Sequence, residues 1–501
     1  MHLASREAAR HLAQQFRSIE FTVDGVQQML GAVGSSALAR DELAPVRRLL
    51  RGDTSPLSTA IQLFLLADPV NTGKVASLLG PVDEMHNLLE VGGSLARSRI
   101  EVAPHQADEL DWWIAADWPT GRVQAELPRE HVLGVGGASA MLAQSTVRLP
   151  GQSALDLGTG CGIQAFHLAQ HVEHVVGTDI SQRCLEFAHF NAELNDIEVE
   201  LRQGSLLSPV EGERFDSIVS NPPFVIAAPE SARHTYRDSG RAGDRFCGEL
   251  VERVHGHLNE GGYAQLLANW EITDPADWSL HLRQWLADSP LDAWVLQRDV
   301  QDPAAYVSTW LTDAGDGFGG AYAERYDQWV TELENRGVLG VGFGLINLRA
   351  GGSEAPLRVL QHADHPLRQP IGGDISRWFA AQDLVRRHSA VALMSLPLQG
   401  GRDVRVTHER SLVEPSTVAI TIAREQGLAW SAPIDEFGAD LLEAADGSQP
   451  LGVVVEAVAA RLGLDHLSLV ELQPLVARLV VEGFLWLPEE ANRQRGSSEP
   501  T

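Results

Sequence analysis

The sequence predicts an α/β protein whose centre is a doubly wound, parallel sheet of seven strands, flanked by a mostly helical N-terminal domain and a winged-helix-like C-terminal domain. Three observations predict this arrangement. From about Gly151, short apolar runs alternate with amphipathic stretches, which is the pattern of βαβ units. The 501 residues exceed one ordinary core, so two to four domains are expected. Hydrophobic residues make up 44% of the chain and charged residues 21%, a composition typical of folded proteins.

The strand candidates of the central sheet are bounded by glycines, prolines and acidic residues. They are residues 153–157, 174–179, 198–202, 215–220, 263–268, 293–298 and 343–349. The α/β domain that they build is expected to cover residues 120–352.

The segments on either side follow other patterns. Residues 1–119 begin with helix-like periodic stretches, and we expect a helical, winged-helix-like domain that recognises the substrate. A linker is expected at Gly351, where glycine, serine and proline gather. Residues 353–490 are expected to form a mixed α/β domain ending in the order helix, helix, helix, strand, as in winged-helix units. The polar tail, residues 491–501, is expected to be disordered.

Composition limits both location and partners. No apolar run approaches the roughly 20 residues needed to span a bilayer, and the N-terminus lacks a signal-peptide core, so we expect a cytoplasmic protein with no membrane partner. The formal net charge of -28 disfavours general binding to polyanions, so a nucleic-acid substrate would need a local basic patch. Cys161, Cys184 and Cys247 lack the paired spacing of zinc sites, and no metal is expected.

A glycine-rich turn follows the first strand of the sheet, in the sequence ALDLGTGCG that ends at Gly162. Gly158, Gly160 and Gly162 permit a tight turn and a close approach by a ligand, and the following helix offers free N–H groups. Dinucleotide-binding loops have the pattern GxGxxG, whereas this loop is GxGxG preceded by Asp156. An acidic residue there repels a pyrophosphate and suits a ligand with a cationic amino group. The turn therefore disfavours a nicotinamide-dependent oxidoreductase.

A second acidic residue, Asp179, ends the next strand in the sequence VVGTDI. A carboxylate at this place can accept hydrogen bonds from both hydroxyls of a ribose. The two segments together favour a nucleoside cofactor. An ordinary loop with a capping aspartate is the alternative.

The sequence NPPF, from Asn221 to Phe224, directly follows the fourth strand. Pro222 and Pro223 lack N–H groups, so nearby carbonyl oxygens stay free to accept from a ligand. The amide oxygen of Asn221 and the carbonyl of Pro222 can each accept one hydrogen of an NH2 group, while Phe224 can stack on a planar substrate. This arrangement orients a nitrogen lone pair toward a methyl donor and acts by positioning. The alternative is a proline turn that only caps a strand.

These three motifs, in this order and spacing, resemble the class I S-adenosylmethionine-dependent methyltransferase superfamily with its Rossmann-like sheet. The Asn-Pro-Pro-Phe form is similar to the N-methyltransferases of adenine, guanine or release-factor glutamine, above all to the release-factor glutamine N5-methyltransferase and methyltransferase small-domain group. The resemblance covers roughly residues 120–352 and implies S-adenosyl-L-methionine as the cofactor.

The resemblance also implies roles for single residues. Asp179 would lie at the ribose, and Ser205 stands where the family carries an acidic contact to the adenine amine. Residues 132–139 resemble a cofactor-covering loop. The implied cofactor-binding residues are Asp156, Gly158, Thr159, Gly160, Gly162, Asp179, Ile180, Ser205 and Asn221. The implied catalytic residues are Asn221, Pro222, Pro223 and Phe224.

Three functions remain open from the sequence. We favour methylation of a protein amide, in particular glutamine, because an acidic chain without basic tracts suits a protein or peptide substrate. The first alternative is an adenine-N6 methyltransferase on RNA or DNA, which would stack a flipped base on Phe224 and need a basic groove. The second is a non-catalytic cofactor-binding regulator, which would not need an amine-holding segment such as NPPF.

Overall fold

The computed structural model describes residues 3–80, 87–119, 122, 130–226, 241–313, 320–352, 355–363, 365–410, 412, 418–464 and 468–488. It divides into two compact units. The larger unit comprises Met1–Ala143 and Leu149–Asp364, and the smaller comprises Gln144–Arg148 and His365–Thr501.

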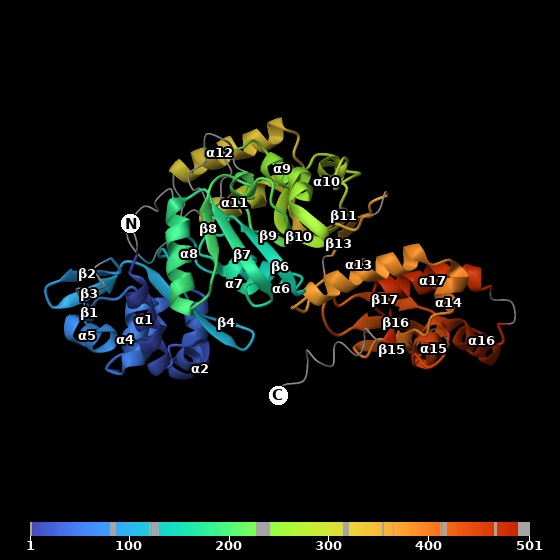
Figure 1. Cartoon of the computed structure of the whole chain (residues 1–501), viewed down its shortest axis with the longest axis horizontal. Coiled ribbons are helices and arrows are strands. Elements are labelled where there is room, and N and C mark those ends of the chain that lie inside the picture. The colour runs from blue at the N-terminus through green and yellow to red at the C-terminus, as the bar shows by residue number, and fades with distance from the viewer. Residues whose placement is uncertain are drawn as a thin grey trace. The chain divides into compact units, whose positions relative to one another are not determined.

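An eight-stranded sheet forms the centre of the larger unit (Figure 1). Its strand order is β13-β11-β12-β10-β9-β6-β7-β8, and β12 alone runs antiparallel to its neighbours β10 and β11. The strands are β6 (Gly151–Leu157), β7 (Val172–Asp179), β8 (Glu200–Gln203), β9 (Phe215–Ser220), β10 (Leu258–Ile272), β11 (Asp292–Gln301), β12 (Gly340–Arg349) and β13 (Arg358–His362).

All seven expected strands are present, and the doubly wound α/β class is confirmed. The expected number is one too low, because β13 adds an eighth strand that pairs in parallel with β11. The sequence RVLQH has two adjacent apolar residues and no alternation, and none of these side chains is fully buried. This strand is therefore defined by its pairing with β11 and not by its own pattern.

Both faces of the sheet are covered by helices. Ala154 packs in a core with Phe166 and Phe187, whereas its neighbour Leu155 packs in a second core with Leu250 and Trp285. Alternate side chains of a strand point to opposite faces, so a strand buried on both faces is apolar throughout. The helices of this region are α6 (Gly137–Ser145), α7 (Ile163–Leu168), α8 (Gln182–Asn195), α9 (Arg245–Arg253), α10 (Leu280–Leu286), α11 (Pro303–Asp313) and α12 (Gly320–Asn335), with short 3₁₀ turns at Ser208–Val210 and Val254–His257.

The chain turns back at the centre of this sheet. From β6 it crosses to β7 and β8 on one side, and it then returns to β9 and β10 on the other. Where the strand order reverses in this way, a crevice opens at the carboxyl ends of the strands and commonly binds a ligand. The fold thus places the carboxyl ends of β6, β7 and β9 together.

The N-terminal region packs against the sheet domain within the same unit. Its elements are α1 (Arg6–Ser18), α2 (Val23–Ala39), α3 (Leu43–Leu49), α4 (Pro56–Phe64), β1 (Val70–Asn71), α5 (Thr72–Leu79), β2 (Leu89–Gly92), β3 (Leu95–Ser98), β4 (Glu101–Ala107) and β5 (Leu110–Ala116). Asn191 of α8 makes the link to β5: its Oδ1 accepts from the Ala115 N–H at 2.7 Å, and its Nδ2 donates to the Ala115 carbonyl at 2.9 Å. The same Nδ2 lies 2.9 Å from the Cys161 carbonyl in the glycine turn. Through Asn191, the N-terminal region therefore helps to hold the glycine turn in place.

The smaller unit has a separate core that includes Leu441, Leu451, Val476 and Phe484. Its last elements follow the expected order of three helices and a strand, while its winged-helix character stays a prediction. Its elements are α13 (Gly372–Arg387), α14 (Ala390–Met394), β14 (Gln399–Gly400), β15 (Val404–Arg410), β16 (Val418–Arg424), β17 (Ser431–Ile434), α15 (Glu436–Ala444), α16 (Leu451–Leu462), α17 (Leu469–Val481) and β18 (Leu485–Trp486).

The domain boundaries expected at residues 119 and 352 also stay predictions. The larger unit continues through β13 to residue 364. The tail, residues 491–501, lies outside the described residues. None of the described helices is long and apolar enough to cross a membrane.

Candidate cofactor and acceptor site

A cavity of about 290 Å³ lies at the carboxyl ends of β6, β7 and β9. Loops that are far apart in the sequence meet around it. They include residues 130–134, 158–161, 178–181, 204–206 and 220–223. Ser139 and Arg241 complete part of its wall. The structure thus brings the glycine turn, the Asp179 segment and the NPPF segment to one place.

The glycine turn needs glycine for two different reasons. Gly158, Gly160 and Gly162 have φ angles of 75°, 56° and 95°, a region that other residues rarely adopt. A Cβ at Gly158 or Gly160 would meet no atom within 4 Å, whereas a Cβ at Gly162 would lie 2.7 Å from the Phe166 ring. Gly158 and Gly160 line the cavity and Gly162 does not, so Gly162 serves the packing of α7 beneath the turn.

Asp156 lies beneath this turn and not in the cavity wall. It is 1% exposed, and its Oδ2 accepts from Thr159 Oγ1 at 2.6 Å and from the Ala165 N–H at 3.0 Å. Burial raises the pKa of this carboxyl to about 7. The resemblance implies that Asp156 binds the cofactor. The structure instead places its side chain beneath the turn, where its hydrogen bonds hold the turn against the start of α7.

Asp179 does line the cavity. Its Oδ2 accepts from the Gly160 N–H at 3.0 Å and its Oδ1 from the Ser181 N–H at 2.8 Å. Each carboxylate oxygen keeps a further lone pair, so both can still accept a hydroxyl hydrogen. Burial raises the pKa of Asp179 above its ordinary value, although the N–H groups of Ser181 and Gly160 oppose this rise.

Three further residues that were expected to bind the cofactor also line the cavity. Ile180 lines the cavity and is 55% exposed, which suits contact with a ligand. Ser205 also lines the cavity, in the loop after β8, and its carbonyl accepts from the hydroxyl of Ser208 at 2.8 Å. Thr159 also lines the cavity while its hydroxyl donates to Asp156.

The NPPF segment begins in the cavity and leaves it at Phe224. Asn221, Pro222 and Pro223 line the cavity, and Asn221 Nδ2 donates to Ser139 Oγ at 3.2 Å. Phe224 is not among the lining residues; its ring lies 6.1 Å from Trp310 of α11 in an edge-on contact at 70°. Asn221, Pro222 and Pro223 thus face the cavity, whereas Phe224 and Trp310 form an aromatic wall next to this segment.

The charges around the cavity suit a nucleoside without phosphates. Arg241 is the one Lys or Arg among the described residues of the wall, and Glu249 pairs with it at 2.6 Å. Phosphate groups are usually held by several cations. The wall instead offers the Asp179 carboxylate for hydroxyls and apolar surface from Leu157, Ile163 and Leu206.

Comparison with known proteins agrees with this geometry. Residues 134–276 match the family described as methyltransferase small domain. This segment is a methyltransferase small domain. Residues 18–99 match a domain of unknown function, DUF7059.

Relatives of two kinds share the methyltransferase domain. The chain is 38% identical over 122 residues to a release factor glutamine methyltransferase of Geobacter sulfurreducens, which is 22% of this chain and 43% of the relative. It is 34% identical over 170 residues to the enzyme of that name from Koribacter versatilis, 30% of this chain and 60% of the relative. It is also 30% identical over 135 residues to ribosomal RNA small subunit methyltransferase C of Haemophilus influenzae, 26% of this chain and 37% of the relative. The chain spans about half the length of the release-factor relatives that it matches.

These matches confirm the expected S-adenosylmethionine-dependent methyltransferase class and its cofactor, S-adenosyl-L-methionine. The residues present fit that cofactor. Gly158 and Gly160 leave open space at the turn, and Asp179 offers lone pairs for the ribose hydroxyls. Ser205 also lines the cavity, but it stands in place of the acidic residue that the resemblance implies at the adenine amine. When bound, the cofactor supplies a methyl group on a positively charged sulfur.

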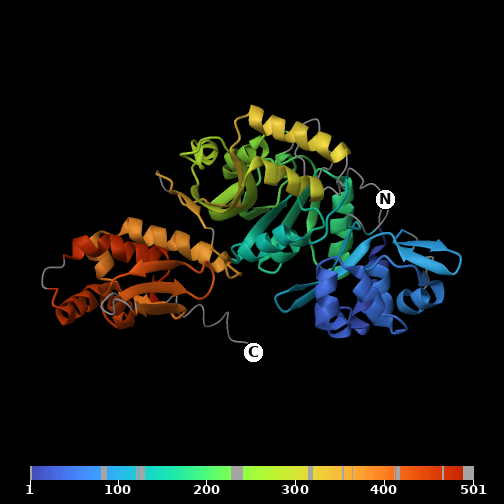
Figure 2. The same ribbon diagram turned by 180° about the vertical axis from the view of Figure 1, so that it is seen from behind.

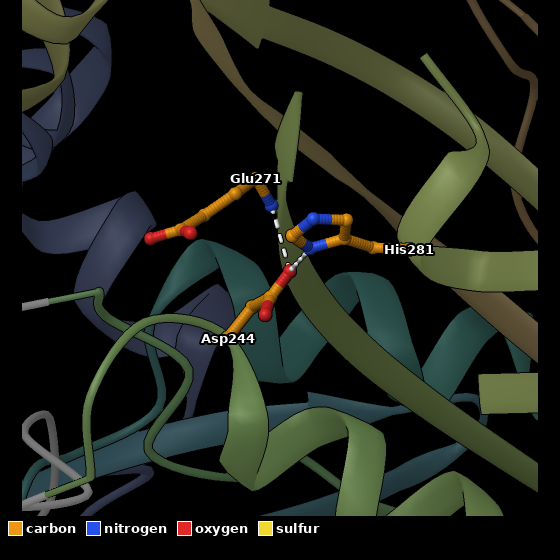
Figure 3. A group of neighbouring side chains, drawn as sticks. All are labelled: Asp244, Glu271 and His281. Carbon is orange, nitrogen blue, oxygen red and sulfur yellow. Dashed lines mark hydrogen bonds and ion pairs between the residues drawn. The ribbon is translucent and has the colours of Figure 1, made fainter. Parts of the chain in front are cut away.

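A buried ionic cluster lies beside the methyltransferase site, at the carboxyl end of β10. Figure 3 shows Asp244, Glu271 and His281, whose ligand atoms lie within 4.8 Å of one another. His281 Nδ1 is 2.6 Å from Asp244 Oδ2, and this contact raises the pKa of His281. Glu271 pairs with Arg336 at 2.8 Å. Asp244 thus pairs with His281 and Glu271 with Arg336, so a divalent metal ion would have to displace Arg336.

Several residues that line the cavity were not predicted from the sequence. Glu130, His131, Cys161 and Cys184 line the cavity, but neither their types nor their spacing indicated it. Ser139 was included only as the end of an expected covering loop. Its contact with Asn221 joins segments 82 positions apart, which no local pattern reveals.

Proposed function

We propose that the chain is an S-adenosylmethionine-dependent N-methyltransferase whose acceptor is a protein glutamine amide. The observation that supports this most is the position of Asn221 at the cavity edge with Nδ2 held by Ser139. This contact turns Oδ1 away from Ser139 and leaves it to accept a hydrogen of the acceptor NH2 group.

The proposed reaction needs positioning more than strong acid–base catalysis. Asn221 Oδ1 and the Pro222 carbonyl accept the two amide hydrogens, which points the nitrogen lone pair at the methyl group. A new N–C bond forms as the S–C bond breaks, and S-adenosylhomocysteine leaves. The nitrogen then loses one proton to water.

Charge favours a protein acceptor. The net charge of -28 repels polyanions, and the one guanidinium in the described part of the cavity wall is neutralised by Glu249. The release factor glutamine methyltransferases among the relatives are named for a protein acceptor.

A base in RNA is the second candidate. The edge-on pair of Phe224 and Trp310 offers an aromatic wall on which an unstacked base could lie, and one group of relatives is named for ribosomal RNA. A protein amide is also planar, so this wall does not separate the two acceptors.

Labelling in lysate tests the function and separates the acceptors. Purified protein and S-adenosylmethionine with a radioactive methyl group are added to lysate, with protease or nuclease treatment afterwards. Label in protease-sensitive, nuclease-resistant material is the expected result, and it should disappear in Asn221→Ala. Asn259→Ala is the matched control, because Asn259 lies at the start of β10 and bonds to Asp216, remote from the cavity.

Other outcomes contradict parts of the proposal. Label removed by nuclease would replace the protein amide with a nucleobase. Label in neither fraction, or label unaffected by Asn221→Ala, would overturn the assignment of a catalytic N-methyltransferase that acts on macromolecules through this motif.

A further inference from the structure

The helices α11 and α12 lie between β11 and β12 in the chain, and both appear in yellow and yellow-green (Figure 1, Figure 2). β11 and β12 are antiparallel neighbours, and a loop of about two residues is enough to join such strands. The inserted helices are thus not needed to connect the sheet. They form a separate core with the residues that follow the NPPF segment.

Ile226 is held in this core through both of its backbone groups. Its N–H donates to Tyr306 Oη of α11 at 2.7 Å, and its carbonyl accepts from Trp329 Nε1 of α12 at 2.8 Å. The exposed fractions of Ile226, Tyr306 and Trp329 are 1%, 0% and 3%. Buried backbone groups outside regular structure need partners, and here side chains of the inserted helices provide them.

The same helices reach the acceptor motif and the sheet. Trp310 lies between Tyr306 and Phe224, with ring centroids 6.2 Å and 6.1 Å away. Tyr306 Oη also accepts from Asn269 Nδ2 of β10 at 3.2 Å. Directly after α12, Arg336 pairs with Glu271 of β10. Tyr306 and Trp329 are therefore anchored to the sheet and do not move freely with the segment that they hold.

We propose that Tyr306 and Trp329 are positioning residues of the acceptor site. By fixing Ile226 they fix Phe224, two residues earlier, and the Asn221 amide at the cavity edge. This inference rests on the proposed function, because it concerns the same acceptor. It assigns to α11 and α12 the alignment of the acceptor nitrogen, where an error of about 1 Å costs about 100-fold in rate.

Tyr306→Phe and Trp329→Phe test the proposal. Tyr306→Phe removes the hydroxyl and keeps the ring, whereas Trp329→Phe removes the indole N–H and replaces the indole with a smaller phenyl ring. Trp294→Phe is the matched control, because Trp294 is buried and its Nε1 donates to Gln361 Oε1 at 3.1 Å across β11 and the edge strand β13. Three quantities are measured for each variant: the rate of methyl labelling in lysate, the dissociation constant of S-adenosylmethionine, and the hydrogen-exchange rate of the Ile226 amide.

We expect the labelling rate of Tyr306→Phe and Trp329→Phe to fall by about 10-fold or more. Affinity for S-adenosylmethionine should change less than about twofold, because neither residue lines the cavity. Exchange of the Ile226 amide should accelerate by about 10-fold or more in Tyr306→Phe. Trp294→Phe should leave all three quantities close to those of the wild type.

Unchanged exchange at Ile226 would overturn the proposal even if the wild type labels no acceptor, so the two proposals fail separately. An unchanged labelling rate in an active protein would also overturn it. A loss of cofactor affinity, or an equal effect of Trp294→Phe, would reduce Tyr306 and Trp329 to general structural residues and likewise overturn it.

Discussion

The side chains of Asn221 and Ser139 are joined by a hydrogen bond of 3.2 Å from Nδ2 to Oγ. Asn221 follows β9, and Ser139 lies in α6 ahead of the glycine turn. The Ser139 carbonyl is itself fixed by Gln164 Nε2 at 2.7 Å. The amide of Asn221 therefore has one defined orientation, and within the described part of the chain no donor occupies its Oδ1.

The first prediction compares the two partners of this bond. Ser139→Ala removes a hydrogen bond of about 0.5–1.5 kcal/mol, so we expect the methyl-transfer rate to fall by about 2- to 10-fold. Asn221→Ala removes the acceptor oxygen itself and should cost about 100-fold or more. Initial rates of methyl labelling check both values. An effect of Ser139→Ala as large as that of Asn221→Ala would contradict the indirect role of the serine.

Local patterns were sufficient to predict most of the sheet and the motifs at its edge. The seven strands, the glycine turn, Asp179 and Asn221 were found because apolar runs, glycines and prolines act over a few residues. Parallel strands then bring their carboxyl ends together, which explains why separate motifs meet at one cavity.

The features that sequence reasoning missed depend on pairing between distant segments. β13 is a strand because β11 lies beside it, and Asp156 lies beneath the turn because α7 closes over it. The contacts of Tyr306 and Trp329 with Ile226 span 80 and 103 positions. No periodicity in the chain marks such contacts, because their residue types are ordinary core residues in isolation.

The second prediction separates two glycines of one turn. Alanine at Gly160 or Gly162 costs about 1–2 kcal/mol because of the positive φ angle. Gly162→Ala also forces its Cβ against the Phe166 ring, so its melting temperature should fall further than that of Gly160→Ala. Gly160→Ala should instead place its Cβ in the cavity and weaken S-adenosylmethionine binding by about 10-fold. Calorimetry measures both quantities, and the reverse ranking of the two variants would contradict the assigned roles.

The third prediction concerns the pH dependence caused by Asp156. Its pKa in the folded state, about 7, lies above the ordinary value of 3.8, so the folded state binds the proton more tightly than the unfolded state. The free energy of unfolding contributed by this group is therefore fully present below about pH 4 and is lost as the pH rises toward 7. The asparagine side chain of Asp156→Asn cannot ionise, so its contribution to the free energy of unfolding does not fall over this pH range.

Urea unfolding of both proteins between pH 4.5 and pH 7, without cofactor, measures the difference, and other titrating groups cancel in the comparison. We expect wild-type stability relative to Asp156→Asn to fall by on the order of 1 kcal/mol per pH unit. Parallel stability curves would show that the carboxyl is not buried as described.

The last prediction concerns Asp179 and cofactor affinity. Asp179→Asn keeps the size of the side chain but replaces one oxygen that faces ribose hydroxyls, and it removes the charge. We expect S-adenosylmethionine to bind about 10-fold more weakly or worse, since hydrogen bonds to a charged group are worth roughly 1.5–3 kcal/mol. Because burial raises the pKa of Asp179, wild-type affinity should also weaken as the pH is lowered from neutral toward 4, and the variant should lose that dependence.

Asp216→Asn is the matched control for this experiment. Asp216 Oδ2 also accepts from two backbone N–H groups, those of Gln152 and Ser153, but it lies at the amino end of the strands. Titration calorimetry at pH 7.5 and pH 5 gives the four dissociation constants for each protein pair. If Asp216→Asn weakened binding as much as Asp179→Asn, the effect would come from the sheet as a whole. A contact between Asp179 and the ribose requires that only the variant at the cavity loses affinity.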